Sequence, residues 1–144
     1  MISLEPVTAD NWRACAALSV RPDQQGFVSP VTYYLCVCAY GTTWQPLAIV
    51  RAGVVVGFVM WGVDEDRSRW IGGLVVDAAA QRTGVARDAL RLLLDRFAAE
   101  PDCPGAALSY LPDNVVARDL YASLGFAETD EREDDEVVAR RALR

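Results

Sequence analysis

One short segment of this 144-residue chain has the residue types and the setting to bind phosphate groups, and it consists of Gln81, Arg82, Thr83, Gly84, Val85 and Ala86. Residues 70–76 before it are apolar, as in a strand, and residues 85–99 after it have the apolar spacing of an amphipathic helix. A glycine-containing loop between a strand and a helix directs backbone N–H groups and the positive end of the helix dipole at one point. The segment therefore predicts a cradle for a pyrophosphate.

The basic residues narrow the chemistry that can accompany this cradle. All fourteen are Arg, and the chain contains neither Lys nor His. Catalysis by Ser-His-Asp, by Cys-His or by a Schiff-base lysine is therefore excluded. The phosphate-binding signature of nucleoside triphosphatases, which requires a Lys, is absent. Any proton transfer must use a carboxylate, a Tyr, a Cys or water.

Length and composition predict a single globular domain over residues 1–144, since 52% of the residues are hydrophobic and 24% are charged. The net charge of −6 argues against a nucleic-acid partner and favours neutral or cationic small molecules. No stretch pairs basic residues with an apolar leader, and no apolar run approaches the ~18 residues of a membrane span. We therefore expect a cytoplasmic protein that does not associate with membranes.

The four cysteines do not predict a metal site. Cys15, Cys36, Cys38 and Cys103 show no C-x-x-C spacing and have no His to complete a ligand set. Their surroundings in the sequence are apolar, so we expect buried, reduced thiols and no bound metal.

Hydrophobic periodicity predicts six strands and four helices. The expected strands span residues 2–7, 47–50, 54–63, 69–76, 106–110 and 137–143. The expected helices begin at a cap on Thr8 or Asp10 and end at Leu18, begin at Ser29 followed by Pro30 and end near Tyr40, and span residues 85–99 and 114–124. The acidic residues 128–135 are expected to form a solvated turn before the last strand.

Two motifs in this order of elements resemble those of the GCN5-related N-acetyltransferase (GNAT) superfamily. QRTGVA, residues 81–86, is similar to the family's Q/R-x-x-G-x-G/A acetyl-CoA loop, with Ala86 in place of the commoner final Gly. NVVARDLYASLGF, residues 114–126, is similar to its N-x-x-A-x-x-L/F-Y-x-x-x-G-F helix. ISLEPVT at residues 2–8, Asn11-Trp12 and QGFV at residues 25–28 resemble the branch that contains bacterial spermine/spermidine (diamine) N-acetyltransferases.

The resemblance implies an α/β fold of the α+β type, with a central mixed and mostly antiparallel sheet of six to seven strands flanked by about four helices. It also implies an N-acetyltransferase that moves an acetyl group from acetyl-CoA to a primary amine of a small molecule, such as a polyamine. The amine would attack the thioester directly, and no metal would take part.

The resemblance further implies which residues hold the cofactor. The strand that ends in Leu74, Val75 and Val76 would separate from its neighbour, so that its free backbone groups bind the pantetheine arm. Gly84 and Ala86 would let the phosphates approach the backbone of residues 81–86, and Arg82 or Arg87 would add a charge-assisted contact.

The resemblance gives Tyr121 the role of catalytic acid and directs Asn114 at the cofactor. A phenol with a pKa of ~10 can donate its proton to a departing thiolate, whose acid has a pKa of ~8.5. Asn114 precedes Tyr121 by seven residues, about two helical turns, so both side chains are expected on one helix face.

No base for the acceptor amine follows from the motifs. Some relatives carry a Glu on the strand before the cradle, where this chain has Gly72 and Gly73. The remaining candidates are four carboxylates, of which the last three are also typical of a solvated turn: Glu5, Asp64, Glu65 and Asp66.

Features outside the two motifs leave the acceptor and the assembly open. Phe27 and the aromatic residues of the second expected helix, Tyr33 among them, could form an acceptor-site wall or ordinary packing. Acetylation of a protein N-terminus or of an antibiotic amine uses the same cofactor motifs, and a CoA-binding sensor without catalysis is a further alternative. Either the C-terminal strand or the aromatic helix face could pair two copies as a homodimer.

Overall fold

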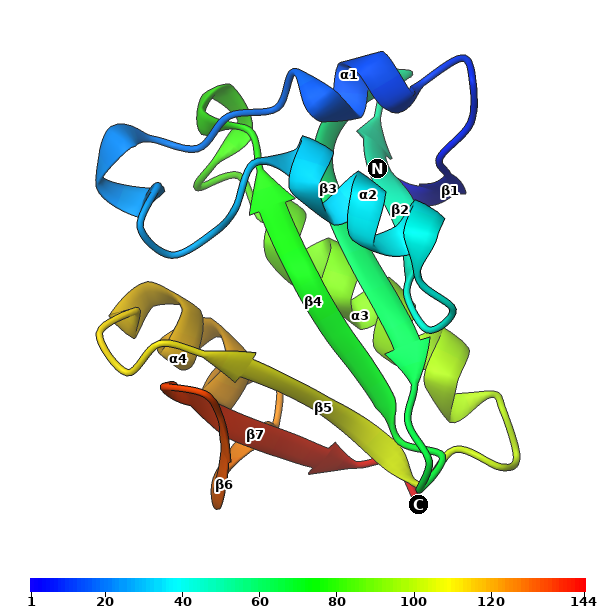
Figure 1. The fold of residues 1–144 in the computed structure, drawn as a ribbon, viewed down its shortest axis with the longest axis vertical. Helices are drawn as coiled ribbons and strands as arrows, with labels where there is room; N and C mark the ends of the chain where they lie inside the picture. Colours follow the sequence, from blue (N-terminus) through cyan, green and yellow to red (C-terminus); the bar gives the residue numbers. More distant parts are fainter.

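All 144 residues are described in the computed structural model, in which one seven-stranded sheet carries four helices (Figure 1). The strands are β1 (Ile2–Pro6), β2 (Gln45–Arg51), β3 (Val54–Val63), β4 (Arg69–Val76), β5 (Gly105–Tyr110), β6 (Ala127–Glu133) and β7 (Glu136–Ala142). The helices are α1 (Trp12–Ala16), α2 (Val31–Tyr40), α3 (Val85–Ala98) and α4 (Val115–Ser123), with 3-10 turns at Pro22–Gln24 and Ala78–Ala80. The spatial order is β1-β2-β3-β4-β5-β7-β6, and only β4 and β5 pair in parallel, so the predicted fold class is confirmed.

Helices cover both faces of the sheet, and Figure 1 shows α1 and α2 on one face of β2 to β4 and α3 on the other. Because successive residues of a strand point to opposite faces, each face of β3 has its own core. Phe58 packs with Cys15 and Val31 on the side of α1 and α2. Val59 packs with Leu90 on the side of α3. The middle of the sheet is therefore fixed from both sides.

Strands β4 and β5 are paired only at one end. Arg69 lies opposite Ala106 and Trp70 lies opposite Ala107, and no further pair joins the two strands. Figure 1 shows them diverging from this end as the two arms of a V. Ile71, Gly72, Val75 and Val76 remain paired with β3 on their other side, so this part of β4 has one backbone edge without a partner strand, as the resemblance implied.

A buried Arg69 fastens the closed end of the V. Its side chain is 2% exposed, and it donates to the carboxylates of Glu100 and Asp102 and to the backbone carbonyl of Arg67. Both acids lie in the segment that leads from α3 to β5. A buried guanidinium with two carboxylate partners holds the start of β4 against the chain that enters β5.

A β-bulge at Gly73 sets which side chains of β4 face the gap. Val75 pairs with Phe58 and Gly72 pairs with Met60, so two residues of β4 oppose one residue of β3. Gly73 has φ +59°, and an added Cβ would lie 3.2 Å from the Tyr34 ring. Only glycine meets both conditions at low cost.

The first two helices begin later than predicted. Asn11, and not Thr8 or Asp10, is the N-cap of α1, and the helix already ends at Ala16. Thr8 Oγ1 instead accepts a hydrogen bond from the backbone N–H of Asp10 in the turn before the helix. The N-cap of α2 is Pro30, which has no side-chain acceptor, so the predicted cap by Ser29 is wrong.

The acidic residues 128–135 do not form the predicted solvated turn, because they supply most of β6 and the turn into β7. Strand β6 is an edge strand on which every side chain except that of Thr129 is exposed. It pairs with β7, and the Glu131 carboxylate accepts two hydrogen bonds from Arg140 at 2.6 and 2.9 Å. The last strand accordingly spans Glu136–Ala142.

This topology contradicts one of the two predicted routes to a homodimer. The C-terminal strand β7 lies between β5 and β6, so neither of its edges is free to pair with a second copy.

We predict that the double substitution E100A/D102A lowers the free energy of unfolding by about 3 kcal/mol, because it leaves the Arg69 guanidinium buried without a carboxylate. This value is at the lower end for broken buried pairs, since both carboxylates are nearly half exposed. Urea denaturation measures the change. D130A, which removes an exposed carboxylate, is the control and should stay within ~0.5 kcal/mol of the parent. A double variant as stable as D130A would contradict the role of Arg69.

Candidate functional site

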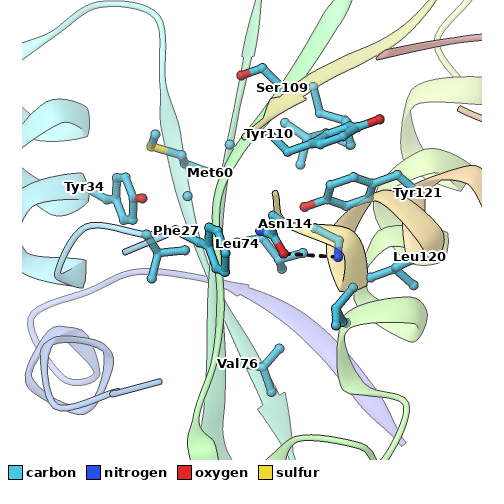
Figure 2. Close-up of a pocket in the computed structure, with 18 of the residues that line it drawn as sticks. Phe27, Tyr34, Met60, Leu74, Val76, Ser109, Tyr110, Asn114, Leu120 and Tyr121 are labelled. Carbon is cyan, nitrogen blue, oxygen red and sulfur yellow. Dashed lines mark hydrogen bonds between the residues drawn. The ribbon is translucent and has the colours of Figure 1, made fainter. Parts of the chain in front are cut away.

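A cavity of about 1000 Å³ lies where β4 and β5 separate. Its wall combines residues of β4, the loop into α3, β5 and α4 with residues of the segment between α1 and α2. Figure 2 shows Tyr34 and Phe27 on one side of the cavity and Tyr110 and Tyr121 on the other, with Leu74 of β4 between them. Segments distant in sequence therefore meet around one space.

The loop predicted to hold phosphates forms one end of this cavity. Its lining residues are Gln81, Arg82, Gly84, Val85, Ala86 and Arg87. Gly84 is the N-cap of α3 with φ +84°, and the first hydrogen bond inside the helix runs from the N–H of Asp88 to the carbonyl of Gly84. The N–H groups of residues 85–87 thus have no intrahelical partner and remain available to an anion.

Two residues of the loop hold it in shape. The Gln81 side chain donates to Gln24 Oε1 at 2.7 Å and to the Val76 carbonyl at 3.0 Å, which ties the loop to β4 and to the segment between α1 and α2. Thr83 does not line the cavity, because its hydroxyl donates to the Ala80 carbonyl and accepts from Arg51.

On β4, alternate side chains separate the cavity from the core. Leu74 and Val76 line the cavity, whereas Val75 is 3% exposed and packs beneath α1 and α2. Beyond Trp70 the strand has no β5 partner, so an extended ligand can lie beside it as an added strand would.

Tyr121 of α4 faces the cavity, and Figure 2 shows its hydroxyl directed toward β4. Its ring contacts Tyr110 and Phe126 at centroid distances of 5.5 and 6.2 Å. Burial, followed by the charge of Glu136, raises the pKa of Tyr121 to about 12. No hydrogen bond to protein engages the hydroxyl in the way that Ser29 engages Tyr34, so the phenol keeps its proton and is free to donate it.

Asn114 lies at the cavity but not on the helix face predicted for it. It is the N-cap of α4, and its Oδ1 accepts a hydrogen bond from the Ala117 N–H at 3.3 Å (Figure 2). Asn114 lines the cavity, and its amide nitrogen has no protein acceptor. The side chain therefore both starts the helix that carries Tyr121 and presents a donor.

Of the aromatic residues predicted as a wall, Phe27 and Tyr34 reach the cavity and Tyr33 does not. Tyr33 is instead 59% exposed. Tyr34 stacks on Phe58 of the core, and its hydroxyl oxygen accepts a hydrogen bond from the Ser29 N–H at 2.9 Å. Two adjacent tyrosines on a helix cannot both face the sheet, and Tyr34 is the one that does.

A side chain that could act as a base would crowd an aromatic ring at either Gly72 or Gly73. A Cβ on Gly72 would lie 3.2 Å from the Trp44 ring, and one on Gly73 would lie as close to Tyr34. Of the four carboxylates proposed from the sequence, only Asp64 lines the cavity. Both of its oxygens are engaged, one by Trp70 Nε1 and the other by the N–H of Glu65.

Three further carboxylates line the cavity, and sequence reasoning missed them. Asp119 lies on α4, Glu133 ends β6 and Glu136 begins β7. Glu133 lies within residues 128–135, which were interpreted as a solvated turn, and Glu136 follows them directly, which is why no signal drew attention to either.

The cysteines take no part in the site. Cys15 and Cys103 are buried as predicted, but Cys36 is exposed, so burial does not extend to all four. No group of three or more His, Cys, Asp or Glu side chains has the arrangement of a metal site. None of the helices combines the length and the apolar run that a membrane crossing requires.

Comparison with known proteins identifies the family. A sequence model described as Acetyltransferase (GNAT) family matches residues 11–126, which include both the phosphate loop and α4. The chain belongs to the GNAT family of acetyltransferases. The spermine/spermidine N(1)-acetyltransferase of Bacillus subtilis (strain 168) is 27% identical to this chain in a 132-residue alignment, and the match covers 87% of each protein.

Solved structures show the same GNAT fold. The ribosomal-protein-S18-alanine N-acetyltransferase of Escherichia coli superposes with a TM-score of 0.76 at 19% identity, over 99% of this chain and 94% of that one. The structure of AAC(6′)-Ib in complex with paromomycin and acetyl-CoA gives 0.81 at 16% identity, over 98% and 93%. At these identities the likeness concerns the fold.

The GNAT family uses acetyl-CoA, and the cavity fits that molecule in two respects. The unpaired N–H groups at the start of α3 suit a pyrophosphate, and the open edge of β4 suits the amide-bearing pantetheine arm. The chain is therefore an acetyl-CoA-dependent acetyltransferase by family and has the space and the donors that such an enzyme needs.

Proposed function

We propose that this acetyltransferase acetylates a primary amine of a small cationic acceptor, and that polyamines of the spermine and spermidine type are the acceptors it fits best. The observation that carries the proposal is the charge of the cavity wall. Four carboxylates line the space that also contains Tyr121, while its three Arg side chains belong to the phosphate loop, the first turn of α3 and the segment between α1 and α2. An acidic wall attracts an alkylammonium ion and repels an acceptor that carries negative charge.

Each part of the cavity has a place in the proposed reaction. The N–H groups of residues 85–87, with Arg82 and Arg87, bind the pyrophosphate, and the open edge of β4 with Leu74 and Val76 orients the pantetheine arm. Acetyl-CoA, when bound, supplies an acetyl thioester. Phe27 and Tyr34 form the wall on the acceptor side. Val75 and Thr83 contribute only by holding β4 and the loop in place.

Tyr121 is the catalytic acid in this proposal. With a pKa of about 12 it is neutral at any physiological pH, so it can give a hydrogen bond to the sulfur as negative charge develops there. Full proton transfer from this buried phenol to a thiolate whose conjugate acid kept its ordinary pKa of ~8.5 would be uphill by about 5 kcal/mol. The same burial that raises the pKa of the phenol raises that of a thiol beside it, which reduces this difference.

The acceptor class is tested by thiol release from acetyl-CoA with spermine, spermidine, a diamine, an aminoglycoside and a short peptide as acceptors. We expect kcat/KM for the polyamines to exceed that for the peptide by at least tenfold, because two or more ammonium groups can interact with the acidic wall. Preference for the peptide or the aminoglycoside would contradict the polyamine assignment. Absence of turnover with all five, while acetyl-CoA still stabilises the chain against heat, would favour the sensor.

We predict that G84A weakens binding of CoA by about tenfold or more, measured by titration calorimetry. Alanine is disfavoured at φ +84° by roughly 1–2 kcal/mol, so G84A favours a different backbone conformation at the residue that precedes the free N–H groups of α3. G26A is the matched control, since Gly26 lies outside the cavity, does not have a positive φ, and an added Cβ there meets nothing within 4 Å. Equal affinity for CoA in G84A and G26A would refute the phosphate site.

We predict that Y121F lowers kcat about 100-fold and leaves the affinity for CoA unchanged. The Tyr121 hydroxyl has no protein partner to lose, so folding should be unaffected, and Y33F, which changes an exposed tyrosine outside the cavity, is the control. If Y121F kept more than a third of the parent kcat, Tyr121 would not be the acid.

The pH dependence of the parent adds a second check on Tyr121. Its raised pKa keeps the acid form of Tyr121 present up to about pH 11. Ionisation of Tyr121 should therefore not lower kcat of the parent between pH 7 and 10, and Y121F should not remove a fall in kcat over that range.

A further inference from the structure

The proposed reaction needs a group that receives the proton of the acceptor amine, and none of the carboxylates proposed from the sequence fits. Glu5, Glu65 and Asp66 lie outside the cavity, and both oxygens of Asp64 are engaged. The answer must therefore come from the carboxylates that the fold brings to the cavity from β6, β7 and α4.

Glu136, the first residue of β7, differs from its neighbours in burial and in free hydrogen-bonding capacity. It is half-buried, whereas Asp119 and Glu133 are exposed. Its Oε1 accepts a hydrogen bond from Ser109 Oγ at 2.7 Å, and no protein donor reaches Oε2. No Arg forms an ion pair with it, although Asp119 has such a partner in Arg118. A partly desolvated carboxylate with one free oxygen in a cavity is suited to an ammonium ion.

The position of Glu136 relative to the catalytic acid is also suitable. Ser109 and Tyr110 are successive residues of β5, so their side chains point to opposite faces of the sheet. Glu136, which bonds to Ser109, and Tyr121, whose ring contacts Tyr110, therefore line the cavity from opposite faces. The carboxylate is close enough for its charge to act on the Tyr121 hydroxyl. Its register partner across the hairpin is Glu133 of β6, and its charge acts on Tyr121 of α4. Glu128 of β6 and Arg118 of α4 are the charged groups that act on the neighbouring Tyr110 of β5.

We propose that Glu136 binds the amino group of the acceptor and accepts its proton, and that Ser109 holds the carboxylate in position for this. The inference rests on the proposed function. Glu136 is a catalytic residue in this account, because it touches the acceptor nitrogen, and Ser109 is a positioning residue.

The protons balance in the following sequence. The acceptor ammonium gives one proton to Glu136, which passes it to bulk water. The neutral nitrogen forms a bond to the thioester carbon, and the carbon–sulfur bond breaks. The sulfur takes the Tyr121 proton, the nitrogen loses its second proton to Glu136, and Tyr121 regains a proton from Glu136 through water. One ammonium and one acetyl thioester thus give one amide, one thiol and one proton released to water.

The test compares E136Q with E133Q over the pH range 7 to 10, using the best amine of the panel. The amide oxygen that E136Q introduces can still accept the Ser109 hydrogen bond, so this substitution removes charge and basicity but little structure. E133Q removes a carboxylate of the same cavity from the opposite strand of the hairpin. S109A removes the hydrogen bond and leaves the carboxylate.

We expect kcat/KM of E136Q to be about 100-fold below the parent at pH 7, and the deficit to shrink as the pH approaches the amine pKa of ~10.4. It shrinks because more of the amine is then already neutral. Ionisation of the nearby tyrosines does not affect the comparison over this pH range, since burial raises the pKa of both Tyr110 and Tyr121. E133Q removes one charge of the acidic wall but not the proposed base, so it should lose no more than about tenfold, by the same factor at every pH, and S109A should lose roughly three- to tenfold.

Binding provides a readout independent of turnover. In calorimetry without acetyl-CoA, E136Q should bind the amine about tenfold more weakly than E133Q does, and both variants should bind CoA as the parent does. E136Q within threefold of the parent in kcat/KM, or a deficit that is the same at every pH, would overturn the assignment of Glu136. A parent chain that acetylates no amine would instead overturn the proposed function, and the inference with it.

Discussion

Strands β4 and β5 share only two residue pairs, and the rest of β4 consequently exposes one row of backbone N–H and C=O groups to the cavity. Buried backbone groups need partners, so an edge of this kind favours an occupant that supplies them. The gap persists because each arm of the V is fixed elsewhere. Arg69 fastens the closed end, β3 holds β4 on both sides of the bulge, and β7 holds β5 along its other edge. The phosphate loop, Tyr121 and the acidic hairpin lie around the gap because these three attachments place them there.

The chemistry of the cavity rests on a separation of charge between its parts. The start of α3 offers N–H groups and arginines to phosphates, while the β6–β7 hairpin and α4 offer carboxylates to a cation. Tyr121 lies against apolar rings, which explains why its pKa rises and why it can serve as a neutral donor. An acetyl group transferred between a thioester and an amine needs these three environments within one enclosed space.

The sequence predicted the elements that have a strong pattern and missed those without one. Strands β3 and β4 were placed residue for residue, because each is a long apolar run bounded by turn residues. Strand β6 was missed because an edge strand with both faces in solvent shows no alternation of apolar and polar residues. Glu136 was missed because an acidic run beside a turn does not reveal that one of its residues lies at a cavity. The sequence did not reveal that Tyr34 rather than Tyr33 is the tyrosine of α2 at the cavity, because α2 is apolar around most of its circumference and its phase is not readable from composition.

The central claim is that the open edge of β4 holds the acetyl donor between the phosphate loop and Tyr121. A crystal structure of the chain with CoA tests it most directly. The account predicts a pyrophosphate at the N–H groups of residues 85–87, a pantetheine arm that hydrogen-bonds to residues 71–76 of β4, and a sulfur within hydrogen-bond distance of the Tyr121 hydroxyl. A CoA molecule outside the gap, or a β4 that pairs with β5 beyond Trp70, would contradict it.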